Sequence, residues 1–165
     1  MGAQTLGKET ILIETSMGNM KVKLYEETPL HKVNFMKLVR DHFCDSLLFH
    51  RVINSFMIQG GDPITKKAKV VDTLGNEELG YTIPAEINPK LIHKKGTLCA
   101  AREGDDVNPK FASSSCQFYI VQGKVRSSED IKKAEERINR TANTNAGRVV
   151  MKSEQGKMLK AQYDK

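Results

Sequence analysis

The first part of the chain alternates apolar and polar side chains with the period of a strand, and a helical period follows it. Residues 10–14 and 20–25 both have one apolar face, and Gly18 lies in the short turn sequence between them. These two runs predict a hairpin. Thr28-Pro29 is typical of a helix start, and apolar residues three and four positions apart follow it, which predicts a helix over residues 29–41.

Four further strands are predicted after this helix. Runs 46–53 and 56–60 are separated only by Asn54-Ser55 and predict a second hairpin. The other two predicted strands are residues 97–101 and 116–122, while 80–87 looks extended and 102–115 looks like a loop. Six short strands with one early helix predict a mainly-β domain, a barrel or a sandwich, and not a doubly wound sheet.

The sequence changes character near Gly123. Beyond it the chain is rich in Lys, Arg and Asn, and Ser127 precedes an amphipathic pattern that predicts a short helix over 127–139. Three parts are therefore predicted. They are a flexible N-terminal leader (1–8), a β domain (9–123) and a basic, partly helical insertion or tail (124–165).

Charge follows the same division. The 165-residue chain has a net charge of +6. Residues 1–123 hold 15 basic and 14 acidic side chains, whereas 124–165 hold 11 and 6. Because the basic excess belongs to the last segment, a specific nucleic-acid partner is not predicted. No apolar run approaches the roughly 18 residues of a membrane span, so none is predicted.

The cysteines and histidines do not have the spacing of a metal site. Cys44, Cys99 and Cys116 are scattered, which predicts reduced thiols, and the four histidines lack a ligand motif. No metal or cofactor is therefore expected. The first residues lack the apolar core of a secretory signal, so the chain as written is expected to be cytoplasmic. It would be periplasmic or secreted if a leader had been removed from a longer precursor.

The candidate chemistry is concentrated in residues 49–62. Arg51 shares strand parity with apolar neighbours, and a charged side chain in that register costs free energy unless it is paired or functional. Met57 and Gln59 share one face, and Gln117 and Tyr119 repeat the combination of an amide and a large side chain in the last strand. Taken alone, each of these residues has an ordinary structural explanation. A lone arginine in a strand, for example, is usually a surface group. Together they provide one cation, two amides and apolar groups, without a nucleophile or general base.

This set resembles the cyclophilin family of peptidyl-prolyl isomerases over about residues 9–123. The resemblance is carried by residues 49–61, by 96–101 and by 115–120. It implies a cyclophilin-like antiparallel β-barrel, of which six of eight strands are identifiable, with one early helix. The helical pattern over 127–139 looks like an insertion found in divergent bacterial members.

The resemblance also implies a role for each site residue. Arg51 is implied as the catalytic residue. The implied substrate-binding residues are Phe56, Met57 and Tyr119 around the proline ring, Gln59 and Gln117 on the substrate backbone, and Ala101 and Arg102 beside the residues that precede proline. The family usually has Asn where Arg102 stands. The implied reaction is rotation of X-Pro bonds in peptides and unfolded proteins, which makes no covalent intermediate and needs no cofactor.

The chain departs from the family after Gln122. The family's next pocket segment, its second helix and its last two strands are not found in residues 124–165, and the chain has no tryptophan. A fragment of a longer protein is the interpretation we favour. Closure of the barrel by the tail or by a partner stays open, as does the oligomeric state. An incomplete pocket predicts weak cyclosporin binding and leaves a second function open: a proline-peptide binding or chaperone module with little turnover.

Overall fold

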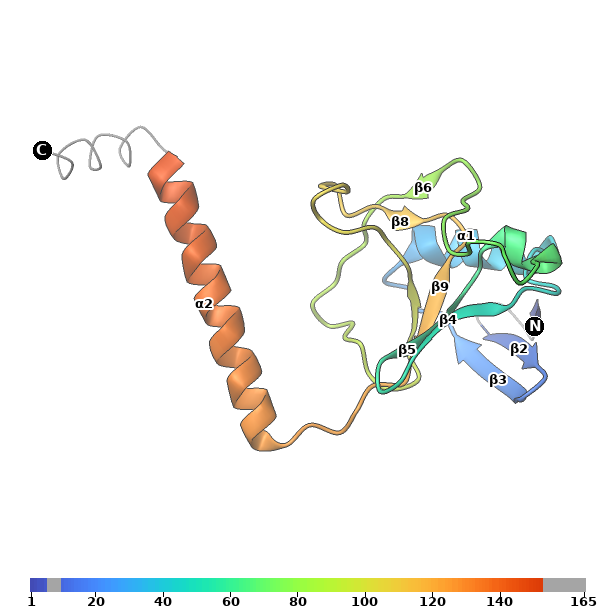
Figure 1. The fold of residues 1–165 in the computed structure, drawn as a ribbon, viewed down its shortest axis with the longest axis horizontal. Helices are drawn as coiled ribbons and strands as arrows, with labels where there is room; N and C mark the ends of the chain where they lie inside the picture. Colours follow the sequence, from blue (N-terminus) through green and yellow to red (C-terminus); the bar gives the residue numbers. More distant parts are fainter. Residues whose placement is uncertain (6–9, 153–165) are drawn as a thin grey trace, which may run out of the picture. The chain divides into compact units, whose positions relative to one another are not determined.

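The computed structural model describes residues 1–5 and 10–152, with side chains described as far as residue 144. The described residues form a mainly-β structure with two α-helices (Figure 1). The chain divides into two compact units, the first spanning Met1–Lys124 and the second beginning at Val125. No helix in the described ranges is both long and apolar enough to span a membrane.

The first sheet has the order β1-β2-β3 and contains the first predicted hairpin. Strands β2 (Thr10–Thr15) and β3 (Gly18–Lys23) pair antiparallel, as predicted. Strand β1 (Gly2–Thr5) pairs with β2, so the predicted flexible leader is wrong for these residues. The physical reason is burial, because Ala3 lies opposite Ile13 and is only 6% exposed. Residues 6–9 of the predicted leader and domain start lie outside the described residues.

Helix α1 (Pro29–Arg40) packs its inner face on the first sheet and forms the core with it. Met36 and Val39 are buried against residues of β2 and against Leu47. The Thr28 side chain makes no capping hydrogen bond. The Glu86 carboxylate caps the helix from a distant loop instead, accepting hydrogen bonds from the backbone N–H groups of Leu30 (3.0 Å) and His31 (2.9 Å).

The second sheet has the order β4-β5-β9-β7 and positions the candidate residues. Its strands are β4 (Phe49–Ile53), β5 (Met57–Gly60), β9 (Phe118–Val121) and β7 (Leu98–Ala100). In the antiparallel register, Arg51 lies opposite Gln59, which lies opposite Tyr119, which lies opposite Cys99. The four candidate strands that were predicted separately along the sequence are therefore neighbours in one sheet (Figure 1).

Three short elements lie in the segments that connect the strands of the second sheet. A 3₁₀ helix, η1 (Pro63–Lys67), follows β5. Strand β6 (Thr82–Ile83) pairs with β8 (Ser113–Ser114), so part of the predicted 102–115 loop is a strand. Strand β6 lies within residues 80–87, which were predicted as extended, whereas the two-residue length of β8 explains why no periodic pattern revealed that strand.

Helix α2 (Ser128–Lys152) is longer than the predicted 127–139. It begins with a reciprocal cap in which Asp130 N–H donates to the Ser127 hydroxyl at 3.1 Å and the Asp130 carboxylate accepts from Ser127 N–H at 3.2 Å. Past Asn139 the apolar pattern ends but the helix continues. There the hydroxyls of Thr141 and Thr144 donate to backbone carbonyls four residues earlier, so polar side chains satisfy themselves within the helix.

Candidate functional site

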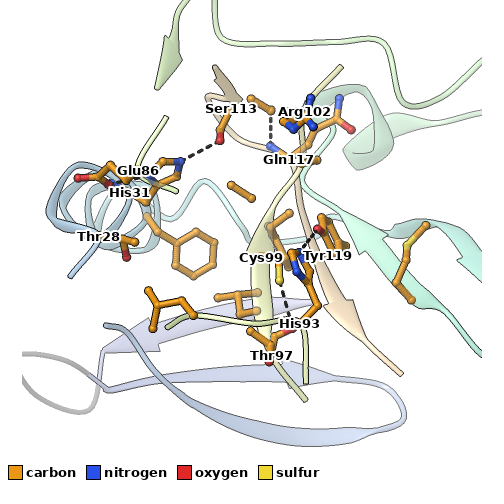
Figure 2. A pocket seen from close by; sticks show the side chains of 18 of the residues that line it. Thr28, His31, Glu86, His93, Thr97, Cys99, Arg102, Ser113, Gln117 and Tyr119 are labelled. Carbon is orange, nitrogen blue, oxygen red and sulfur yellow. Dashed lines mark hydrogen bonds and ion pairs between the residues drawn. The ribbon is translucent and has the colours of Figure 1, made fainter. Parts of the chain in front are cut away.

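The eight predicted site residues line a single cavity of about 940 Å³ in the first unit. They come from three strands and from the segments beside them, and Figure 2 shows several of the side chains around this cavity. The set that the structure brings together is Arg51, Phe56, Met57, Gln59, Ala101, Arg102, Gln117 and Tyr119. The arrangement agrees with the predicted grouping, while the role of each residue stays a prediction.

A directional chain of hydrogen bonds connects the guanidinium to the two amides. Arg51 Nη1 donates to Gln59 Oε1 at 3.2 Å, and Gln59 Nε2 donates to Gln117 Oε1 at 2.9 Å. Gln117 Nε2 then donates to the backbone carbonyls of Gly75 (3.0 Å) and Glu77 (3.1 Å). A guanidinium can only donate and a carbonyl can only accept, so both ends of the chain determine which way each amide faces.

Burial differs along this chain of hydrogen bonds. Gln117 is only 5% exposed, Gln59 is partly buried, and Arg51 is exposed. A buried amide with all its partners satisfied holds one orientation, because breaking these bonds leaves polar groups without partners. The result is a guanidinium that lines the cavity and is held by the Gln59 amide through one of its N–H groups.

Large apolar side chains form the neighbouring wall. Met57 is 2% exposed, whereas Phe56 is half exposed at the rim. The Tyr119 ring stacks on His93 with centroids 6.0 Å apart, and its hydroxyl lies 2.8 Å from His93 Nε2 (Figure 2). Burial raises the pKa of Tyr119 to about 12, so the phenol is neutral at physiological pH.

Ala101 and Arg102 form another part of the rim. The Ala101 backbone is fixed on both sides, because its N–H donates to Gln117 O at 3.0 Å and its carbonyl accepts from Ser114 N–H at 2.8 Å. The Arg102 guanidinium contacts the Asp105 carboxylate at 2.7 Å and lies 5.3 Å from the centre of the Phe111 ring. The positive charge of Arg102, at the position where the family usually has Asn, therefore interacts with groups of its own loop.

Sequence reasoning missed a second hydrogen-bonded group on the cavity wall. His31 Nδ1 lies 2.6 Å from the Glu86 carboxylate, and His31 Nε2 lies 2.9 Å from the Ser113 hydroxyl (Figure 2). Burial alone would raise the pKa of Glu86, but hydrogen bonds from the N–H groups of His31 and Leu30 and from the His31 ring lower it overall. The group joins α1, a loop and β8, three segments with no common sequence motif.

The carbonyl acceptors of Gly75 and Glu77 were missed for another reason. Every residue carries a backbone carbonyl, so no residue type marks these two as part of the site.

Within the described residues, no cluster of three or more His, Cys, Asp or Glu side chains has the arrangement of a metal site. The cavity places an oriented cation beside an apolar wall. This arrangement suits a ligand in which a neutral ring adjoins a weakly basic atom.

Comparison with known proteins agrees with the geometry. Residues 10–154 match the family model described as cyclophilin type peptidyl-prolyl cis-trans isomerase/CLD. A peptidyl-prolyl cis-trans isomerase-like 3 of Dictyostelium discoideum is 31% identical over 119 residues, which are 72% of this chain and 68% of the relative. A peptidyl-prolyl cis-trans isomerase of Synechococcus elongatus is 39% identical over 110 residues, covering 66% of each protein.

Solved structures show the same similarity. The crystal structure of a cyclophilin type peptidyl-prolyl cis-trans isomerase from Cryptosporidium parvum superimposes with a TM-score of 0.58 at 30% identity, covering 71% of this chain and 68% of the other. A second crystal structure of that protein, obtained in the presence of the dipeptide Ala-Pro, gives a TM-score of 0.57 at 29% identity, with 71% and 70% covered. The chain thus spans about two thirds of the length of these proteins.

Proposed function

Because the chain belongs to the cyclophilin type peptidyl-prolyl cis-trans isomerase family, we propose that it catalyses rotation of X-Pro bonds in peptides and unfolded proteins. The observation that carries this proposal is the oriented guanidinium of Arg51 beside the wall formed by Phe56, Met57 and Tyr119. A related structure obtained with Ala-Pro supports a proline-containing ligand.

The chemistry needs only selective stabilisation of a twisted bond. Amide resonance gives the peptide bond a rotation barrier of roughly 18–20 kcal/mol. In the twisted state the prolyl nitrogen becomes pyramidal and accepts a hydrogen bond, which the planar amide nitrogen does not. A guanidinium N–H of Arg51 that donates to this nitrogen therefore stabilises the transition state more than the substrate. Each 1.36 kcal/mol gained in this way accelerates rotation about tenfold.

The two glutamines have different parts in this proposal. Both N–H groups of the Gln117 amide are committed to Gly75 O and Glu77 O. Among the described residues, Gln59 Nε2 has one hydrogen-bond partner, Gln117, which leaves one N–H for a substrate carbonyl. We therefore assign substrate binding to Gln59 and orientation of Gln59 to Gln117.

A protease-coupled isomerisation assay on a chromogenic Ala-Pro peptide tests the function. Removal of one oriented donor to a developing charge costs about 100-fold in other enzymes, so Arg51→Ala should lower kcat/KM by about 100-fold. Arg40→Ala is the matched control, because Arg40 is exposed on α1 and does not line the cavity. Equal rates for wild type and Arg51→Ala would refute the catalytic role.

The same assay addresses the alternative function. A chain that spans about two thirds of its relatives' length could bind proline peptides without turnover. A background rate for wild type, together with Ala-Pro peptide binding in an NMR titration, would establish a binding or chaperone module. We also propose that cyclosporin binds weakly, and nanomolar affinity in a calorimetric titration would contradict this.

A further inference from the structure

Asp62 is a buried carboxylate next to the site but not part of the cavity wall. It lies two residues after the end of β5 at Gly60 and is 0% exposed. Its Oδ1 accepts a hydrogen bond from Ile64 N–H at 2.9 Å, which starts η1. Its Oδ2 accepts from the backbone N–H of Gly75, thirteen residues further along the chain. Capping of η1 uses only one of the two oxygens, so it does not account for the bond to Gly75.

Gly75 is the point where this carboxylate meets the site. Its N–H donates to Asp62, and its carbonyl accepts from Gln117 Nε2 at 3.0 Å. The residue has φ +101, a conformation that glycine adopts without the penalty of a side chain. A single peptide segment therefore connects a buried carboxylate to the amide that orients Gln59.

From these contacts we infer that Asp62 is a positioning residue for the isomerase reaction. It holds the Gly75 carbonyl in place, the carbonyl orients Gln117, and Gln117 orients Gln59. Gln59 then presents its oxygen to Arg51. This inference rests on the proposed function for its kinetic consequences, whereas the geometric chain itself is independent of that function.

Directionality makes the chain sensitive to its anchor. The Gln117 amide can reverse only by turning its oxygen toward two carbonyl oxygens, which repel it. If the Gly75 carbonyl moves away, Glu77 O alone opposes this reversal. Reversal of the Gln117 amide would also reverse the Gln59 amide. The guanidinium of Arg51 would then face an N–H donor of Gln59 instead of its oxygen. Loss of the anchor is thus expected to disorder the guanidinium without removing any cavity residue.

Asp62→Asn separates positioning from capping. Asn is as good an N-cap as Asp, so its oxygen can keep the bond to Ile64 and preserve η1. Its NH₂ group cannot accept a hydrogen bond from Gly75. The matched control is Asp72→Asn in the same loop, because Asp72 also accepts a backbone N–H, that of Lys69 at 2.7 Å, and has no link to Gln117.

We expect kcat of Asp62→Asn to fall about tenfold and its KM to rise, because Gln59 binds the substrate and would lose its fixed orientation, while Asp72→Asn keeps both values. In ¹H–¹⁵N spectra of the full chain, the side-chain signals of Gln59, Gln117 and Arg51 should move in Asp62→Asn and not in Asp72→Asn. A folded Asp62→Asn protein with wild-type kcat and unmoved side-chain signals would overturn the inference.

Two further outcomes are also decisive. If wild type shows no isomerase activity, the proposed function fails, and the side-chain signals alone decide whether Asp62 positions Arg51. If Asp62→Asn does not fold, hydrogen exchange in wild type decides. The Gly75 amide should then exchange at least 100-fold more slowly than the amides of the exposed residues Val70 and Val71, and equal exchange would refute the anchor.

Discussion

Replacement of Gly61 by alanine should damage both stability and activity, because two backbones meet at this position. A Cβ atom added to Gly61 would lie 2.2 Å from the Cys116 carbonyl oxygen and 2.6 Å from Gln117 Cα. Ordinary contact begins at 3.4 Å, so the first distance is about 1.2 Å too short. Both neighbours are backbone atoms and cannot rotate away as the end of a side chain could. The segment leading into β9 must therefore move.

The magnitude has two parts. Gly61 has φ +105, and a left-handed conformation costs an L side chain about 1–2 kcal/mol. Forcing extra atoms into a packed site costs about 1–3 kcal/mol more. The free energy of unfolding should therefore fall by about 2–5 kcal/mol. Because a displacement of about 1 Å at a catalytic group can cost about 100-fold, kcat/KM should fall by about that factor through the shift of Gln117.

Gly80→Ala is the matched control for this experiment. Gly80 has φ +80, but nothing lies within 4 Å of the Cβ position, so only the backbone penalty of about 1–2 kcal/mol applies. Urea denaturation and the coupled assay on both variants measure the difference. Equal stability of the two variants, with unchanged kcat/KM in Gly61→Ala, would show that Gly61 does not approach the backbone of Cys116 and Gln117 as closely as described.

Two further predictions follow from burial. The pKa of Cys44 is raised to about 11 and that of Cys116 to about 12, in both cases mainly by burial, so a thiol reagent at pH 8 should label them at least tenfold more slowly in the native chain than in urea; rapid native labelling would contradict this. Burial also lowers the pKa of His50 below 6.5, and both its ring nitrogens lack partners among the described residues. The unfolded chain then takes up a proton first as the pH falls, so the free energy of unfolding should decrease between pH 7.5 and pH 5.5. His50→Phe should flatten this slope, and an unchanged slope would exclude His50 as its source.

Periodicity predicted the elements that carry most of the site. Strands β4, β5 and β9 were recognisable as short, largely apolar runs beside turn or loop residues, and strand parity gave the face of Arg51, of Gln59 and of Tyr119 within each separate strand. The antiparallel register places these three residues opposite one another. A side chain in a regular strand has its direction determined by its position, so grouping by sequence was possible.

The supporting contacts could not be predicted in the same way. Glu86 caps α1 from a loop 55 residues away from His31, and local sequence does not specify such a contact. The carbonyl of Gly75 and the carboxylate of Asp62 belong to an irregular segment without periodicity. Helix α2 was predicted too short because its second half is polar and has no apolar pattern to follow. There the hydroxyls of Thr141 and Thr144 donate to carbonyls within the helix, contacts that no apolar pattern in the sequence marks.

The loop beside Ala101 has a closed base, which makes it suitable for grafting. The hydrogen bond from Ser114 N–H to Ala101 O joins its two ends, and the Asn108 side chain bridges to both backbone groups of Ala112. The residues between these ends, including the Arg102–Asp105 ion pair, therefore form a loop whose two ends are held together by a hydrogen bond. Lengthening a surface loop costs little entropy, since each doubling adds only about 0.6 kcal/mol. Libraries of loop sequences between these two ends would test the predicted role of Ala101 and Arg102 beside the residues that precede proline, while the reacting groups stay in place.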